Sequence, residues 1–146
     1  MTHPRFDHVG ITVLDLDAAI AFFTGLGLEP ESEVQVIEGE FVSTVVGLPD
    51  VRVENVVLRP PGGGAGVELS RFLHPLDGRE PQALPASAPG LCNVCFEVDD
   101  LRSTVDRLAA EGHPMVGDVG QYEEMWLMAY VRGPEGIIVS LAESLR

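Results

Sequence analysis

The sequence FDHVGITVLDL, residues 6–16, returns later in the chain as LCNVCFEVDDL, residues 91–101. The two stretches agree in the spacing of their apolar residues, in the Asp before the final Leu, and in the Val two residues before that Asp. They differ where His8 of the first copy aligns with Asn93 of the second. The offset is 93 minus 8, or 85 residues. A repeat of this length predicts two similar structural modules in one chain.

Each copy predicts a strand followed by a helix. In the strands, apolar residues alternate with other residues, which is typical of a strand with one buried face. In the helices, apolar residues recur after four and then three positions, so they share one helical face. Asp15 in the first copy and Asp99 or Asp100 in the second are candidate N-caps, and glycines follow both helices as stop signals. The apolar trios are Leu16, Ile20 and Phe23 in the first copy and Leu101, Val105 and Leu108 in the second.

Two further strands follow each predicted helix. Each pair is joined by a turn rich in Pro and Gly, which indicates a hairpin. A fainter strand between helix and hairpin completes a βαβββ order in each copy. The predicted hairpin strands are residues 51–60 and 66–72 in the first copy and residues 124–133 and 137–143 in the second.

These elements predict an α+β fold of two tandem βαβββ modules. We expect a single domain over residues 1–146, because 146 residues with 45% hydrophobic content can bury one good core but not two ordinary ones. Module one covers about residues 5–73 and module two about residues 91–146. The segment 74–90, rich in Pro, Gly and small residues, is the predicted linker.

Composition narrows the class of protein. No apolar run approaches the roughly 18 residues that span a bilayer, and the first residues lack the pattern of a signal peptide, so we expect a soluble, cytoplasmic protein without membrane contact. The formal charge of −14 disfavours nucleic acid as a partner, because phosphate binding needs clustered Lys and Arg. Cys92 and Cys95 lie three residues apart on one predicted strand and so face opposite sides. We expect two free, buried thiols.

Several stretches resemble the vicinal oxygen chelate superfamily, which contains glyoxalase I, bleomycin-resistance proteins, extradiol dioxygenases and methylmalonyl-CoA epimerase. The resemblance rests on the two βαβββ copies, on the His of the first strand, and on VELSRF (residues 67–72) closing the first copy. FEVDDL (96–101) is similar to the opening of the second copy in glyoxalase-type members, and YVRGPEGIIV (130–139) to their closing hairpin. The resemblance covers nearly the whole chain and implies curved mixed sheets that form an open, barrel-like cup.

In that superfamily the cup holds a divalent metal on residues from the first and last strands of each copy. The resemblance carries these positions to His8, Glu68, Asn93 and Ser140. A divalent metal ion such as Ni, Zn, Fe, Co or Mn needs three or four good ligands from the protein. His8 and Glu68 supply two. The other two positions offer an Asn carbonyl and a Ser hydroxyl, which are weak neutral ligands. We therefore predict a degenerate site that holds one divalent metal or none. Glu68 is the predicted catalytic base for moving a proton.

Six further residues are predicted to contact a ligand. On the strand near the end of the chain, alternate residues form one face that is either ordinary core or an aromatic wall of the cup. The residues of that face are Trp126, Met128 and Tyr130. Ser70 and Phe72 share the face of Glu68, and Cys95 shares the face of Asn93.

Three functions stay open at this point. The leading hypothesis is a protein of the glyoxalase/bleomycin-resistance type that sequesters an organic small molecule without an obligatory metal, because Asn93 and Ser140 replace the expected ligands; the resemblance implies an acidic homodimer. The second is a metal-dependent lyase or isomerase, similar to lactoylglutathione lyase or an epimerase, that moves a proton next to a carbonyl through His8 and Glu68. The third is a biosynthetic cyclase or isomerase with a metal-free acid/base pocket. Extradiol cleavage is least expected, because its iron site needs a second His that these positions lack.

Overall fold

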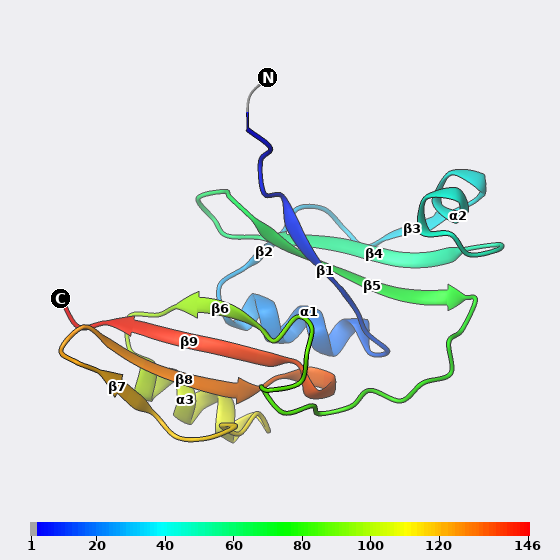
Figure 1. Cartoon of the computed structure of the whole chain (residues 1–146). Helices are drawn as coiled ribbons and strands as arrows, with labels where there is room; N and C mark the ends of the chain where they lie inside the picture. Colours follow the sequence, from blue (N-terminus) through cyan, green and yellow to red (C-terminus); the bar gives the residue numbers. More distant parts are fainter. Residues whose placement is uncertain (1–2) are drawn as a thin grey trace. The chain divides into compact units, whose positions relative to one another are not determined.

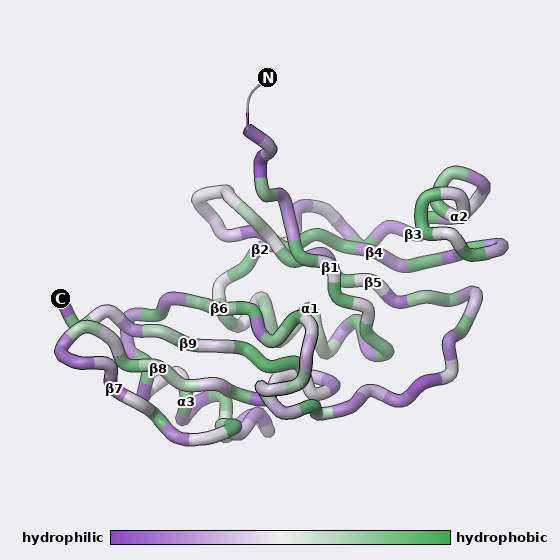
Figure 2. The backbone as a smooth tube through the Cα atoms, viewed as in Figure 1, coloured by the Kyte–Doolittle hydropathy of each residue, from purple (hydrophilic) through white to green (hydrophobic). Residues whose placement is uncertain are grey.

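The computed structural model describes residues 3–146, which form two compact units, the first ending at Arg79 and the second beginning at Glu80. Both units combine a mixed sheet with helices (Figure 1), so the predicted α+β fold of two tandem modules is confirmed. The boundary lies inside the predicted linker 74–90. Residues 77–82 of this linker are hydrophilic and are drawn largely in purple in Figure 2.

The first unit contains a sheet whose central strands form a hairpin. The strand order is β1-β5-β4-β2, with β3 also paired to β4; β1 and β5 are parallel, and the pairs made by β4 are antiparallel. The elements are β1 (His8–Thr12), α1 (Leu16–Gly25), β2 (Glu29–Pro30), β3 (Gln35–Glu38), α2 (Glu40–Val46), β4 (Arg52–Arg59) and β5 (Gly66–His74).

The second unit repeats this topology. Its strand order is β6-β9-β8-β7, with β6 and β9 parallel and the other pairs antiparallel. The elements are β6 (Asn93–Glu97), α3 (Leu101–Ala110), β7 (Gly120–Tyr122), β8 (Trp126–Arg132), the 3-10 turn η1 (Pro134–Gly136) and β9 (Ile138–Ser144).

The repeated helices begin at the predicted caps. The Asp15 carboxylate accepts a hydrogen bond from the Ala18 N–H at 3.0 Å, and the Asp100 carboxylate accepts one from the Ser103 N–H at 3.0 Å. Asp100, not Asp99, is thus the cap of α3, because it lies three residues before the donor. In each unit the helix packs on its own sheet, α1 against β5 and α3 against β8 and β9. The buried apolar residues of the two helices are Leu16, Ala19, Phe22 and Phe23 in α1 and Leu101, Val105 and Leu108 in α3.

Two predictions need correction. The short helix α2 was not predicted, although apolar pairs four residues apart and a following Gly47 in the left-handed conformation are helix signals. The two cysteines are free as predicted, but they are not buried: Cys92 is half-buried and Cys95 is exposed. The reason is that β6 keeps the face carrying Cys95 partly open to solvent.

No helix among the described residues has both the length and the apolar character needed to cross a membrane.

Candidate functional site

The parallel pairing of β1 with β5 brings His8 and Glu68 together. Gly10 is opposite Glu68 in the register, and His8 lies two residues earlier on the same face. His8 Nε2 is 3.6 Å from Glu68 Oε2, which is longer than a hydrogen bond. The side chains are 35% and 32% exposed, so a solute can reach both. The other face of β5 carries the buried core residues Val67 and Leu69.

A second carboxylate lies beside the His8 ring. His8 Nδ1 lies 2.7 Å from Asp7 Oδ2, and Arg59 Nη2 donates to the same oxygen at 3.0 Å. The hydrogen bond from His8, together with the Arg59 guanidinium, holds the pKa of the Asp7 carboxyl well below its usual range. An ionised carboxylate only accepts hydrogen bonds, so this contact is a hydrogen bond when Nδ1 carries a hydrogen. Nε2 is therefore the ring nitrogen presented to Glu68.

Arg59 in turn is held on several sides. Its Nε donates to Glu31 Oε1 at 2.8 Å, and its Nη1 donates to the Asp7 carbonyl at 3.0 Å. The pKa of Arg59 is raised by its hydrogen bonds to Glu31 and Asp7. The result is a row of neighbouring polar side chains from Glu31 through Arg59 and Asp7 to His8 and Glu68.

The equivalent positions of the second unit carry neutral pairs. Cys95 is opposite Ser140, just as Gly10 is opposite Glu68. The Ser140 hydroxyl donates to Cys95 Sγ at 3.4 Å, and the Asn93 amide donates to the Tyr130 hydroxyl at 3.2 Å. Ser140 is 2% exposed. These side chains hold each other through neutral hydrogen bonds and offer no negative charge.

On β8 the helix-facing core and the predicted ligand residues separate cleanly. The buried residues are Leu127, Ala129 and Val131. Trp126, Met128 and Tyr130 alternate with them on the other face, where Trp126 and Tyr130 are half-buried and Met128 is exposed. Tyr130 is opposite Ser140 in the register, so this face also carries Cys95 and Asn93. The second unit thus brings its predicted ligand residues onto one partly open face.

In the first unit the predicted ligand residues have other contacts. The Ser70 hydroxyl accepts a hydrogen bond from the Asn55 amide at 3.0 Å. Phe72 packs on a small apolar cluster that contains Val42 of α2 together with Val51 and Val53. Phe72 therefore helps to anchor α2, which the sequence did not reveal.

Whether a divalent metal fits depends on the donor set. His8 Nε2 and Glu68 Oε2 are two suitable donors on one face. Within the second unit, the Asn93 amide bonds to Tyr130 and the Ser140 hydroxyl to Cys95. Within residues 3–146 there is no group of three or more His, Cys, Asp or Glu that could hold a metal ion. Since such ions take three or four protein ligands, the residues present do not complete a site of that kind.

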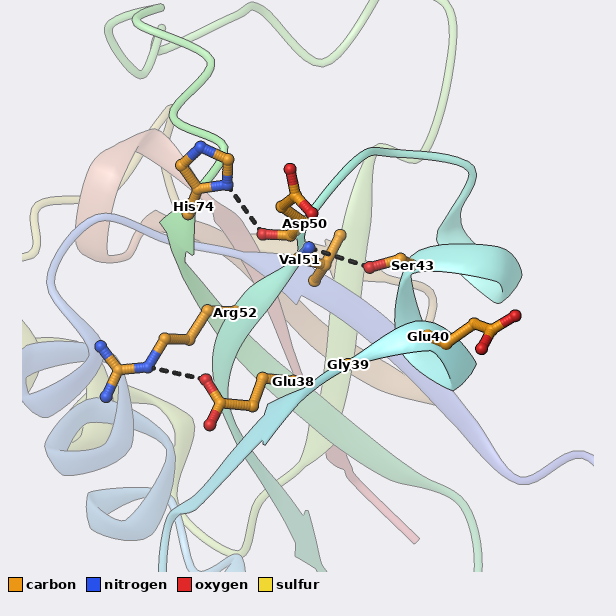
Figure 3. Close-up of a pocket in the computed structure, with 8 residues that line it drawn as sticks. All are labelled: Glu38, Gly39, Glu40, Ser43, Asp50, Val51, Arg52 and His74. Atoms are coloured by element: carbon orange, nitrogen blue, oxygen red, sulfur yellow. Dashed lines mark hydrogen bonds and ion pairs between the residues drawn. The ribbon is translucent and has the colours of Figure 1, made fainter.

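A hollow of about 780 Å³ lies in the first unit at the opposite end of the β4–β5 hairpin from Glu68 (Figure 3). There His74 Nδ1 lies 2.7 Å from the Asp50 carbonyl oxygen, and Arg52 Nε lies 3.2 Å from Glu38 Oε2. The hollow is open and its polar groups are largely paired. Its lining residues are Glu38, Gly39, Glu40, Ser43, Asp50, Val51, Arg52 and His74.

The sequence did not point to Asp7 or Arg59. One signal was available in the repeat: Arg59 and Arg132 occupy equivalent positions at the ends of β4 and β8. Arg59 donates to the Gly64 carbonyl at 3.1 Å and Arg132 to the Gly136 carbonyl at 3.0 Å, each in its own hairpin turn. Recognising the pair requires the strand register, because the two hairpin turns differ in length.

Known proteins share this architecture. A glyoxalase family protein from Bacillus cereus has a crystal structure similar to this chain, with 40% sequence identity, a TM-score of 0.95, and coverage of 100% of this chain and 97% of the other. An ethylmalonyl-CoA/methylmalonyl-CoA epimerase of Cereibacter sphaeroides is 27% identical over 144 residues, which cover 95% of this chain and 97% of that enzyme. TnmS3, an antibiotic binding protein from Streptomyces sp. CB03234, shares the fold with a TM-score of 0.62 at 15% identity, covering 99% of this chain and 98% of the other.

The family assignment rests on more than half of the sequence. Residues 7–130 match the model of the Glyoxalase/Bleomycin resistance protein/Dioxygenase superfamily. The match runs from the residue before β1 into β8, and so includes the first copy and most of the second. The chain therefore belongs to the glyoxalase/bleomycin resistance protein/dioxygenase superfamily.

Proposed function

We propose that the chain is an isomerase-type enzyme that moves a proton at the carbon next to a carbonyl, using Glu68 and His8 without an obligatory divalent metal. The observation that carries this proposal is the pair itself: a carboxylate facing the free nitrogen of a histidine whose other nitrogen is held by Asp7. The epimerase of Cereibacter sphaeroides, similar over nearly the whole chain, supports the same class of reaction.

The chemistry follows from the hydrogen positions. With hydrogen on Nδ1, the Nε2 lone pair of a neutral ring would face the Glu68 carboxylate 3.6 Å away. The proposed reaction uses the form of this pair that carries one further proton. When that proton is on His8, Glu68 is a free carboxylate base and Nε2–H is a donor, so the pair can act on two atoms of one substrate.

In the proposed reaction the substrate carbonyl oxygen accepts a hydrogen bond from Nε2–H of His8. Glu68 takes the proton from the adjacent carbon; the C–H electron pair becomes the C=C bond of an enolate, and the carbonyl π pair moves to oxygen. The charge that develops on this oxygen is stabilised by the His8 donor. Protonation of the planar enolate on its opposite face by solvent water inverts the carbon and restores the carbonyl, and Glu68 releases its proton to water, which leaves the protein unchanged.

Solvent exchange tests this directly. The protein is incubated in D2O with a panel of acyl thioesters, 2-hydroxy ketones and hemithioacetals, and loss of the carbon-bound proton is followed by proton NMR. Glu68→Gln should slow exchange by roughly 10²- to 10⁴-fold, the usual contribution of a general base. Glu54→Gln is the matched control, because Glu54 pairs with Arg71 on the same hairpin and has a similar exposure of 27%.

Two results would count against the proposal. Equal exchange by wild type and Glu68→Gln would remove Glu68 from the reaction. Loss of exchange after EDTA treatment, with recovery on adding a divalent metal, would refute the metal-free part of the proposal.

A second candidate function is sequestration of an organic molecule by the open face of the second unit. It is favoured by the neutral pairs at Asn93 and Ser140 and by the partly exposed Trp126 and Met128 beside them. The chain has a single Trp, so quenching of its fluorescence by candidate ligands reports directly on this face. Binding that is weakened by Met128→Ala and unaffected by Glu68→Gln would favour sequestration over catalysis.

The family resemblance also predicts a homodimer. Light scattering coupled to size-exclusion chromatography tests this prediction: a mass of twice the 15.7 kDa chain is expected, and a mass of 15.7 kDa would contradict it.

A further inference from the structure

We infer that Asp7, held in place by Arg59, is the positioning residue of the site: it fixes the His8 ring with hydrogen on Nδ1 and directs Nε2 at Glu68. The consequence for turnover rests on the proposed function, whereas the ring state is a property of the protein alone. Neither Asp7 nor Arg59 occupies a position to which the family resemblance assigns a role.

The Asp7 carboxylate contacts His8 and Arg59 through the same oxygen. One oxygen, Oδ2, receives both His8 Nδ1 at 2.7 Å and Arg59 Nη2 at 3.0 Å. The shorter distance is typical of a hydrogen bond with an ionised partner. Adjacent side chains of a regular strand point to opposite faces, so Asp7 can reach His8 only because it lies just before β1 begins.

Asp7 is held through its backbone as well. Its carbonyl accepts hydrogen bonds from the Gly66 N–H at 2.9 Å and from Arg59 Nη1 at 3.0 Å. Arg59 is itself anchored to Glu31 on its Nε side. Asp7 is thus held at its backbone carbonyl and at its side-chain carboxylate. A residue that orients a histidine has to be held in place itself.

The second copy of the repeat carries neither the carboxylate nor the histidine. In the second unit the position equivalent to Asp7 is Cys92, and the position equivalent to His8 is Asn93. Arg132 replaces Arg59, but it donates to the Leu84 carbonyl at 2.8 Å instead of a carboxylate. The carboxylate and the histidine therefore occur together in one copy and are both lacking in the other, as expected if one serves the other.

A purely structural role is the competing explanation, because Arg59 also bonds to the hairpin turn at Gly64. The two roles differ in the hydrogen position on the His8 ring. In water a neutral imidazole prefers hydrogen on Nε2, so a ring held with hydrogen on Nδ1 needs an acceptor beside that nitrogen. A residue that only stabilises the fold would leave this preference unchanged.

The test is long-range proton–nitrogen NMR on the full chain with 15N-labelled histidine, at a pH where the ring is neutral. The chain has four histidines, and His8→Asn assigns the His8 signals. Wild type should show hydrogen on Nδ1. Asp7→Ala should shift the ring to the Nε2–H form, and Asp7→Asn, whose amide oxygen still accepts, should retain Nδ1–H. Glu31→Gln is the matched control: it removes a carboxylate from Arg59 that does not touch His8, and should leave the signals unchanged.

Either of two results would overturn the inference: hydrogen on Nε2 in the wild-type protein, or an unchanged ring in folded Asp7→Ala. The wild-type spectrum and Asp7→Asn keep the inference testable if Asp7→Ala does not fold. Once a substrate is known, Asp7→Ala should lower kcat roughly 10- to 100-fold with little change in KM, the usual effect of losing a partner that orients a histidine. Failure to find proton exchange would count against the proposed function, while the ring state would still decide the role of Asp7.

Discussion

Gly66 lies where the site meets the sheet, and Gly66→Ala should destabilise both. A Cβ on Gly66 would lie 2.4 Å from the Leu58 carbonyl oxygen and 3.0 Å from Arg59 Cγ. Ordinary contacts of a Cβ begin at 3.4 Å, so β4 and β5 would have to separate locally by about 1 Å. The arginine can adjust, but the Leu58 carbonyl is backbone and cannot move without disturbing the hairpin.

The cost follows from this overlap. Forcing an extra methyl group into a packed region typically destabilises a protein by about 1–3 kcal/mol. For a chain of this size each kcal/mol lowers the melting temperature by roughly 2–4 °C, so we expect a decrease of about 2–12 °C. The effect should extend to the site, because Gly66 is paired with His8 in the register and its N–H donates to the Asp7 carbonyl at 2.9 Å.

Thermal unfolding followed by circular dichroism measures the change. Gly62→Ala is the matched control, because it lies in the same hairpin turn and a Cβ there would meet nothing within 4 Å. Gly62→Ala should unfold at the wild-type temperature. If Gly66→Ala does so too, the close contact inferred between a Cβ at position 66 and the Leu58 carbonyl is refuted. An unchanged His8 NMR signal in a destabilised Gly66→Ala would instead refute the coupling between hairpin and site.

Three further predictions concern stability and are measured by urea unfolding. The pKa of Asp7 is lower in the folded protein than in the unfolded chain, so the ionised carboxylate stabilises the fold above about pH 4 and this stabilisation is lost as the pH falls further. In Asp7→Asn the free energy of unfolding should therefore decrease less steeply at acid pH. Ser43→Ala should cost about 1–3 kcal/mol, because Ser43 Oγ accepts the N–H of buried Val51 at 2.9 Å; Ser43→Thr, which keeps the hydroxyl, should cost less. Asp100→Ala should cost about 1 kcal/mol by removing the cap of α3, whereas Asp106→Ala, on the exposed side of the same helix, should have little effect.

The parts of the fold that follow from neighbouring residues could be predicted. Alternation along β1 and β6, the caps Asp15 and Asp100, and the hairpin turns all depend on short-range patterns that recur in the two copies. The helix α2 was not predicted, because it occurs in the first copy and has no counterpart in the second. Elements that both copies contain are supported by two matching patterns, whereas an element of one copy has no second pattern to support it.

The candidate site shows the same division. His8 and Glu68 were found because the family pattern places them on the first and last strands of a copy. Their chemistry depends on residues with no such pattern: Arg59 is 52 positions from the carboxylate that it holds. Likewise, the alternation on β8 left open which face was core, and only the packing of α3 against β8 separates the buried Leu127 face from Trp126.

The sequence by itself determined a duplicated α+β chain, the strands and paired helices of each copy, and the loss of the expected ligands at Asn93 and Ser140. Those features follow from residue type and spacing, which act over a few residues or repeat along the chain. The tertiary structure decided that Asp7 contacts both His8 and Arg59, and that Ser140 and Asn93 bond to Cys95 and Tyr130. Such contacts depend on strand register, which is set by the packing of the whole sheet and brings together side chains that no local pattern connects.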